Sequence, residues 1–163
     1  MARASSVLLV ESTVDDRAMY AEYLRVCGFE PIECDTTDEA LERASHADVV
    51  VTGIRVNGPF DGIELVSRLR ADGATRDKPV IVLTACALEP DRQRAEAVGC
   101  DAFLPKPCLP ETLATEIRRT AALSAAGRRR SHGLRARAAK ARLKSADQQT
   151  RTFDLLKPFR RRK

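Results

Sequence analysis

Short apolar runs without polar alternation constrain the fold of this chain more than any other feature. Residues 6–10 (SVLLV), 48–52 (DVVVT) and 79–84 (PVIVLT) carry apolar and often β-branched side chains at successive positions. Such strands have both faces covered, as in a parallel sheet between layers of helices. No stretch of the chain approaches the roughly 20 apolar residues that a membrane-spanning helix needs.

Segments with helical spacing and helix-end signals separate these runs. We expect the helices at residues 14–27, 37–46, 63–71, 89–98 and 110–123. Gly28 and Gly99 follow two of them as C-terminal caps, and residues 30–34 and 101–105 are weaker strands. Five strands that alternate with five helices predict right-handed crossovers onto one parallel sheet. The predicted class is therefore α/β, a flavodoxin-like doubly wound sheet of order 2-1-3-4-5.

Charge divides the chain into two parts. Residues 128–163 contain 14 Lys or Arg and 2 Asp or Glu, a formal charge of +12, whereas residues 1–127 carry −7. We predict a folded domain over 1–123, a linker over 124–133 and a basic tail over 134–163 that is disordered or partly helical. A basic tail of this kind can bind nucleic acid, or it can bind an acidic protein surface or membrane headgroups. The third alternative is that it has no specific ligand. It shows no known nucleic-acid-binding motif.

Cysteine usage and the N-terminus bear on the compartment. The five cysteines are odd in number and include no CxxC pair. We therefore expect reduced thiols, buried or half-buried, rather than a metal or disulfide framework. Near the N-terminus only four apolar residues are consecutive, too few for a secretory signal, so the predicted location is cytoplasmic.

Four motifs lie at the ends of the expected strands: VLLVES, VVVTGIRVNGPFDG, VIVLTA and FLPKP. In this order and at this spacing they make residues 5–122 resemble the receiver domain of two-component response regulators. The resemblance implies a non-enzymatic signalling module whose partner is a histidine kinase, a regulator or an output protein. In that family an acidic pair after the first strand helps to hold Mg²⁺, and an Asp ending the third strand accepts a phosphoryl group. A Thr or Ser and a Lys contact its oxygens.

The residues at these positions depart from the family at the acceptor. Glu11 and Ser12 stand at the acidic pair, and Gly53 stands where the acceptor Asp belongs. Glycine offers no oxygen for an acyl phosphate, and serine supplies no charge. We therefore expect a degenerate acidic pocket with no catalytic residue and no phosphoacceptor. We also expect no metal-binding residue and weak or absent Mg²⁺ binding.

Other positions match the family. Thr84 corresponds to the switch hydroxyl, Phe103 to the switch aromatic and Lys106 to the lysine, before a proline where the family has a cis peptide. Each also has a structural explanation, since Thr84 and Phe103 suit ordinary packing and Lys106 can pair with Glu11. Residues 57–61 form a loop that is one residue longer than usual.

Three functions stay open. The first is a pseudo-receiver that acts by protein–protein interaction without phosphorylation. The second is a regulator that binds nucleic acid through the basic tail. The third is a receiver that phosphorylates another carboxylate, Asp15, Asp48 or Asp61, although none of the three is expected at the carboxyl end of the third strand.

Overall fold

A computed structural model of the chain describes residues 4–124 and 126–127. The strands are β1 (Ser6–Val10), β2 (Glu30–Cys34), β3 (Val49–Thr52), β4 (Val80–Thr84) and β5 (Ala102–Pro105). The helices are α1 (Val14–Val26), α2 (Thr37–Arg43), the 3-10 turn η1 (Ala44–His46), α3 (Gly62–Ala71) and α4 (Glu89–Ala97). Residues 110–124 form a further helix, called here the C-terminal helix.

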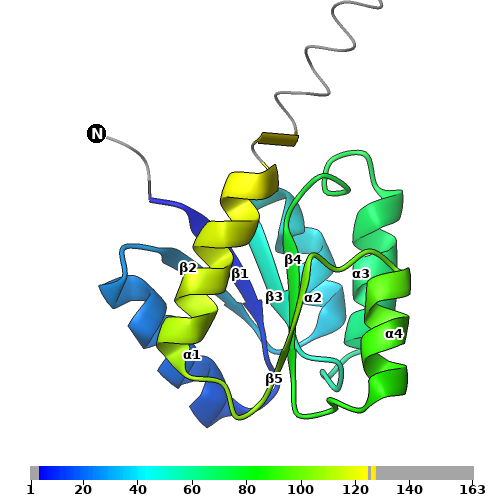
Figure 1. Cartoon of the computed structure of the whole chain (residues 1–163), viewed down its shortest axis with the longest axis horizontal. Coiled ribbons are helices and arrows are strands. Elements are labelled where there is room, and N and C mark those ends of the chain that lie inside the picture. Colours follow the sequence, from blue (N-terminus) through cyan, green and yellow to red (C-terminus); the bar gives the residue numbers. More distant parts are fainter. Residues whose placement is uncertain (1–3, 125, 128–163) are drawn as a thin grey trace, which may run out of the picture. The chain divides into compact units, whose positions relative to one another are not determined.

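The five strands form one parallel sheet in the order β2-β1-β3-β4-β5 (Figure 1). The register pairs Val7 with Val49 on one side and with Pro31 on the other. Every strand therefore ends at the same edge, where the loops that follow it converge. The predicted flavodoxin-like fold, its strand order and its five helices are confirmed.

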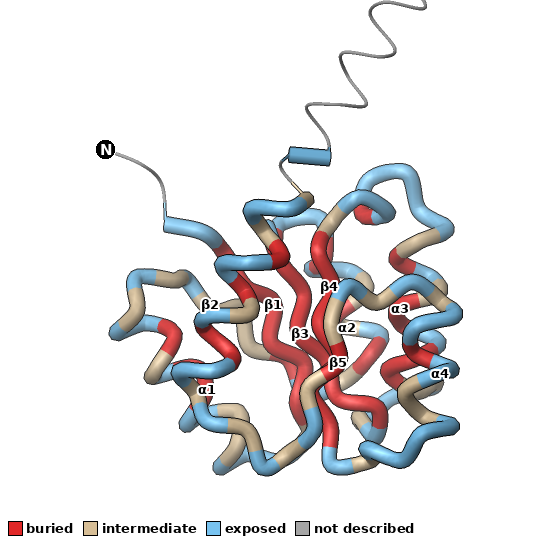
Figure 2. The backbone as a smooth tube through the Cα atoms, viewed as in Figure 1, coloured by how far each residue is buried: buried red, intermediate tan, exposed pale blue. Residues whose placement is uncertain are grey.

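Two apolar clusters cover the faces of the sheet, and alternate residues of β1, β3, β4 and β5 supply them. Figure 2 shows β1, β3 and β4 as buried strands. On one face, Val7 and Leu9 of β1 pack with α1 and the C-terminal helix. On the other face, Leu8 and Val10 pack with α2, α3 and α4. Both faces of β1, β3 and β4 are buried, which explains why these three strand sequences lack polar alternation.

The expected element ends agree with the structure to within a few residues. Gly28 and Gly99 adopt φ values of 84° and 94°, the left-handed conformation of a helix C-terminus. Asp61 caps α3, because its side chain accepts a hydrogen bond from the backbone N–H of Glu64 at 2.8 Å. The helix expected at 37–46 is shorter as an α-helix, since its last turn tightens into the 3-10 turn η1.

Polar side chains secure the amino ends of the strands. Arg70 of α3 reaches across to β5, where its Nη2 donates to Asp101 Oδ2 at 2.9 Å and its Nε donates to the Gly99 carbonyl at 2.9 Å. The Val80 N–H that begins β4 donates to the same Asp101 oxygen at 2.7 Å. Asp48 accepts from the Ser6 N–H at 2.9 Å beside β1.

Within the described residues, no helix is both long and apolar enough to span a bilayer. The predicted tail at 134–163 and most of the predicted linker at 124–133 lie outside the described residues. The division of the chain into these parts stays a prediction.

Candidate functional site at the carboxyl edge of the sheet

A cavity of about 630 Å³ opens where β1, β3, β4 and β5 end. Glu11, Gly53, Thr84 and Lys106 all line it, so the fold brings together four positions singled out in the sequence. They meet because parallel strands deliver their carboxyl ends to a single crevice. Arg55, on the loop after β3, also lines the cavity.

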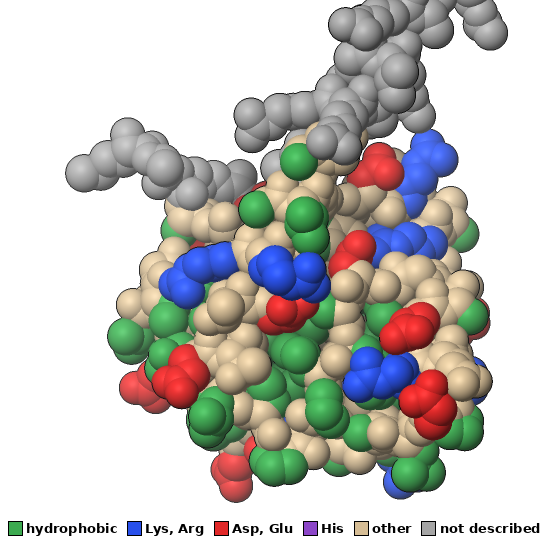
Figure 3. All heavy atoms as spheres, in the orientation of Figure 1, with side chains coloured by type: hydrophobic (Ala, Val, Ile, Leu, Met, Phe, Trp, Pro, Cys, Tyr) green, Lys and Arg blue, Asp and Glu red, His purple; other side chains and the backbone are tan. Residues whose placement is uncertain are grey.

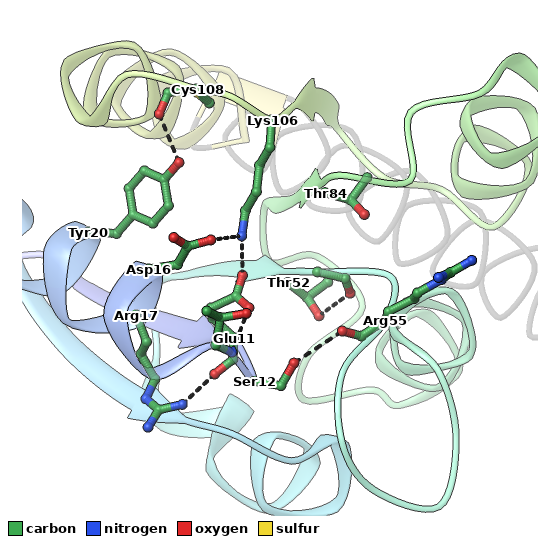
Figure 4. A network of polar contacts seen from close by, with 12 residues as sticks. Glu11, Ser12, Asp16, Arg17, Tyr20, Thr52, Arg55, Thr84, Lys106 and Cys108 are labelled. Atoms are coloured by element: carbon green, nitrogen blue, oxygen red, sulfur yellow. Dashed lines mark hydrogen bonds and ion pairs between the residues drawn. The ribbon is translucent and has the colours of Figure 1, made fainter.

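A charged triad occupies one wall of this cavity (Figure 4). Lys106 Nζ donates to Glu11 Oε2 at 2.6 Å and to Asp16 Oδ2 at 2.7 Å. The Lys106 and Glu11 side chains are 16% and 9% exposed, whereas Asp16 is 39% exposed. The expected pairing of Lys106 with Glu11 is therefore present, and Asp16 is a second partner that sequence reasoning missed.

The ion pairs keep the lysine charged. Burial by itself lowers the pKa of Lys106, but hydrogen bonds and charges from Asp16 and Glu11 outweigh it and raise the pKa above its ordinary value. Tyr20 lies alongside, with its ring centroid 5.9 Å from Lys106 Nζ and its hydroxyl donating to the Cys108 carbonyl at 2.8 Å. Burial raises the pKa of Tyr20, so its hydroxyl remains protonated at neutral pH.

Backbone contacts hold the carboxylate end of the triad. Glu11 Oε1 accepts from the Thr13 N–H at 2.9 Å, and Arg17 Nη1 donates to the Glu11 carbonyl at 2.5 Å. The Lys106 N–H donates to the Thr84 carbonyl at 2.8 Å. Both ends of the ion pair are therefore fixed to the ends of strands.

Gly53 lies buried at the end of β3, and its N–H donates to the Val10 carbonyl at 3.1 Å. A Cβ built there would meet a Val56 methyl carbon at 3.3 Å and the Leu83 carbonyl at 3.7 Å, and φ is not in the left-handed region. A small side chain therefore fits with slight movement of Val56. The backbone does not require glycine at this position.

Gly62 is different, because it packs against the Gly53 carbonyl. A Cβ at Gly62 would lie 1.8 Å from that oxygen, far inside van der Waals contact. The Thr52 hydroxyl donates to the same oxygen at 3.0 Å, and the Gly62 N–H donates to the Ile54 carbonyl at 2.8 Å. Only glycine lets α3 begin this close to the end of β3. The sequence motif contained Gly62, but nothing in it indicated this contact.

The remaining predicted residues contact neighbouring backbone groups or side chains. The Ser12 hydroxyl donates to the Arg55 carbonyl at 3.2 Å. Thr84 Oγ1 accepts from the Cys86 N–H at 3.0 Å. Phe103 is buried beneath the Arg92 guanidinium, 4.7 Å from the ring centroid. The peptide between Lys106 and Pro107 is cis, as the resemblance implied.

The long loop after β3 is tied to α2. The Thr37 N–H donates to the Asn57 carbonyl at 2.9 Å, and the Thr37 hydroxyl donates to the Phe60 carbonyl at 3.0 Å. Gly58 approaches Thr37 so closely, at φ 119°, that a Cβ would clash with it. These contacts fix the rim of the cavity on the side of Arg55.

The three carboxylates considered as substitute acceptors lie elsewhere. Asp48 is at the amino edge of the sheet, Asp61 caps α3 and pairs with Arg94 at 3.5 Å, and Asp15 is exposed in the first turn of α1. The carboxylates that do line the cavity are Glu11, Asp16 and Asp91.

The donor set does not fit the Mg²⁺ that the resemblance implies. Mg²⁺ is bound through one or two carboxylates and demands near-octahedral oxygen geometry. Here Lys106 engages both Glu11 and Asp16, while Gly53 supplies no side-chain oxygen. The described residues contain no cluster of three or more His, Cys, Asp or Glu suited to a metal.

The cysteines agree with the prediction of reduced thiols. All five are free; Cys34 is buried and the other four are partly buried. Burial raises the pKa of Cys34 and of Cys100 to about 11, and it raises the pKa of Cys108. These three thiols are therefore poor nucleophiles at neutral pH.

Two curated proteins illustrate the similarity of this chain to known sequences. The chain is 32% identical over 117 residues to the phosphate regulon transcriptional regulatory protein PhoB of Escherichia coli, covering 71% of this chain but about half (51%) of that relative. It is 31% identical over 104 residues to the polar-differentiation response regulator DivK of Brucella ovis, covering 63% of this chain and 84% of the relative.

Solved structures of receiver domains and response regulators are also similar to this chain. The receiver domain of a sensor histidine kinase from Pseudomonas aeruginosa, solved with a magnesium ion in its active site cleft, matches with a TM-score of 0.67 and 26% identity. That match covers 73% of this chain and 98% of the other. The chemotaxis response regulator CheY4 of Vibrio cholerae matches with a TM-score of 0.67 and 28% identity, covering 72% and 98%. Residues 7–118 match the family described as the response regulator receiver domain, and the chain belongs to that family.

Proposed function

We propose that this chain is a signalling module of the two-component type that acts by protein–protein interaction and does not depend on phosphorylation. The observation that carries the proposal is Gly53 at the end of β3, in a cavity that it shares with Thr84 and Lys106. Thr84 and Lys106 retain the groups that would contact a phosphoryl group, but Gly53, at the end of the strand beside β4, has no side-chain oxygen to carry one.

The charges in the cavity support the same function. Phosphoryl transfer depends on cations that are available to offset charge on the transferring group. Lys106 is already paired with Glu11 and Asp16, and no metal cluster accompanies it among the described residues. Three carboxylates and two cations line the cavity, so its formal charge is −1 and a phosphate gains no net attraction there.

The expected partner is another signalling protein, such as a histidine kinase, a regulator or an output protein, and the expected location is the cytoplasm. The proposal rests on membership of the receiver family and on relatives whose names describe them as regulators. A pull-down with the full chain and with Gly53→Asp identifies the partner. We expect the same partner from both proteins without any phosphodonor.

Intact-mass measurement after exposure to a small phosphodonor and Mg²⁺ tests independence from phosphorylation. We expect no adduct on the wild-type chain. The double variant Ser12→Asp with Gly53→Asp, which restores the family pattern, is the matched control. A stable adduct on the wild type, mapped to Asp16 or Asp91, would instead establish a receiver that uses a non-standard carboxylate.

A second candidate is a regulator that contacts nucleic acid through residues 128–163. The observation that favours it is the formal charge of +12 on that segment. A full-length variant with Gln in place of Arg128, Arg129 and Arg130 should bind duplex DNA more weakly than the wild type. Its affinity should also fall less steeply with salt, because fewer counterions are released. Equal affinity and equal salt dependence would argue against this segment as the binding site.

A further inference from the structure

We infer that the Lys106 ammonium is a built-in cation that takes the place of a metal ion and closes the crevice to divalent cations. This inference deepens the proposed function, on which it rests, by naming how the site is regulated. If the inference holds, the net charge of the crevice depends on the Lys106 ammonium and does not change with the concentration of Mg²⁺.

Nζ lies between two carboxylates and close to one aromatic ring (Figure 4). Two carboxylates accept from it, at 2.6 Å for Glu11 and 2.7 Å for Asp16, and the Tyr20 ring faces it at 5.9 Å. The Glu11 side chain is only 9% exposed, so a cation beside it stabilises its charged form. Lys106 supplies that cation from within the chain.

Two ion pairs and partial burial hold the ammonium at this position. The Lys106 backbone is anchored to the Thr84 carbonyl, and its side chain is 16% exposed. Asp16 comes from the first turn of α1, so the lysine joins the end of β5 to both the end of β1 and the next helix. A metal that entered would have to displace the ammonium from both carboxylates.

Two further oxygen-bearing side chains, Ser12 beside the cavity and Asp91 in its lining, already have partners. The Ser12 hydroxyl donates to the Arg55 carbonyl, and Asp91 lies 3.8 Å from the Arg94 guanidinium. Gly53 adds no side chain. A divalent ion therefore depends on Glu11 and Asp16, which the ammonium already engages.

The inference predicts a gain of metal binding when the ammonium is removed. We would titrate full-length wild type, Lys106→Met and Lys106→Gln with Mn²⁺ and measure bound metal by electron paramagnetic resonance. Quenching of tyrosine fluorescence supplies a second readout near Tyr20. Lys106→Gln also removes the charge but keeps an N–H donor for the carboxylates. Its Mn²⁺ titration tests the inference if Lys106→Met does not fold.

The matched control is Arg55→Met, which removes the same charge from the same cavity without touching the triad. We expect Lys106→Met to bind Mn²⁺ at least about tenfold more tightly than wild type, because a unit charge a few ångströms away is worth more than this factor. Adding Asp16→Asn should abolish the gain, and Arg55→Met should behave as wild type.

Two results would overturn the inference. One is Mn²⁺ affinity of the wild type equal to that of the lysine variants, and the other is an equal gain in Arg55→Met. The phosphodonor experiment remains separate from this test. An adduct on a wild type that excludes Mn²⁺ would reject the proposed function alone, whereas metal binding without an adduct would reject the built-in cation alone.

Discussion

The two ends of the sheet use charged side chains in opposite ways. At the amino edge, Arg70 donates mainly to backbone carbonyls, those of Gly99, Arg76 and Lys78, and to one carboxylate, Asp101. At the carboxyl edge, Lys106 donates to two carboxylates and lines an open cavity. The first network joins loops, whereas the second neutralises charge.

This difference separates architecture from function. Loops at the amino edge are tied directly to one another, so removing their arginine should cost stability without changing any surface that a ligand could enter. The crevice keeps an open cavity, and its lysine pairs with carboxylates of the same crevice. The exposed Leu88 lines this cavity, and the exposed Met19 and Leu109 line a neighbouring pocket that shares Lys106 with it. Figure 3 shows hydrophobic side chains along the lower part of the visible face.

The largest effect is expected from Gly62→Ala at the crevice end of α3. Its Cβ would lie 1.8 Å from the Gly53 carbonyl, so the helix must shift. We expect a loss of about 3 kcal/mol in the free energy of unfolding, measured by urea denaturation. Gly73→Ala near the amino edge, whose Cβ would have no neighbour nearer than 3.8 Å, should change stability by less than about 0.5 kcal/mol. Similar losses in both would show that α3 does not begin against β3.

Arg70→Met should destabilise the fold by removing the contacts that join the loops at the amino edge of the sheet. It removes one ion pair and hydrogen bonds to three carbonyls, so we expect a loss of about 2–3 kcal/mol by urea denaturation. Arg68→Met, on the same helix, removes an exposed pair with Glu64 and should cost less than about 1 kcal/mol. Binding to the partner should be unchanged in both. A weaker partner complex with Arg70→Met would contradict the separation of the two ends.

Removal of the triad's cation should have a smaller, pH-dependent effect. Lys106→Met leaves Glu11 buried without its partner, and we expect a loss of about 2 kcal/mol near neutral pH. The pKa of Lys106 is raised on folding, so its stabilisation is complete below the ordinary value of 10.5 and is lost as the pH rises through the folded pKa. The difference between wild type and variant should therefore shrink in strongly alkaline buffer. Glu11→Gln in the same chain should restore part of the loss, and a difference that grows with pH would contradict this sign.

The smallest effect is expected at the vacant acceptor position. Gly53→Asp places a third carboxylate near Glu11 and Asp16, and we expect about 1 kcal/mol lower stability than for Gly53→Asn in metal-free buffer. The asparagine variant has nearly the same shape and controls for the contact with Val56. Mg²⁺ should recover some stability only when Ser12→Asp is added. Equal melting temperatures for all of these variants would mean that position 53 does not face the acidic side chains.

Sequence patterns were sufficient to predict the helices and strands, but they did not predict every contact in the cavity. Strand and helix ends follow from apolar runs, Gly28 and Gly99, and these signals are local. The pairing of Lys106 with Glu11 was predictable because both follow strands that end at one edge. Asp16 was not, since Asp15 and Asp16 are adjacent in a first turn and only the packing of α1 decides which of them faces Lys106.

By itself, then, the sequence determined the order of elements, the parallel sheet and the lack of a carboxylate at position 53, because each depends on residue type and local spacing. The tertiary structure alone decided that Gly62 must be glycine and that one lysine pairs with two carboxylates. Those facts arise from distances between segments far apart in the chain, which no local pattern encodes.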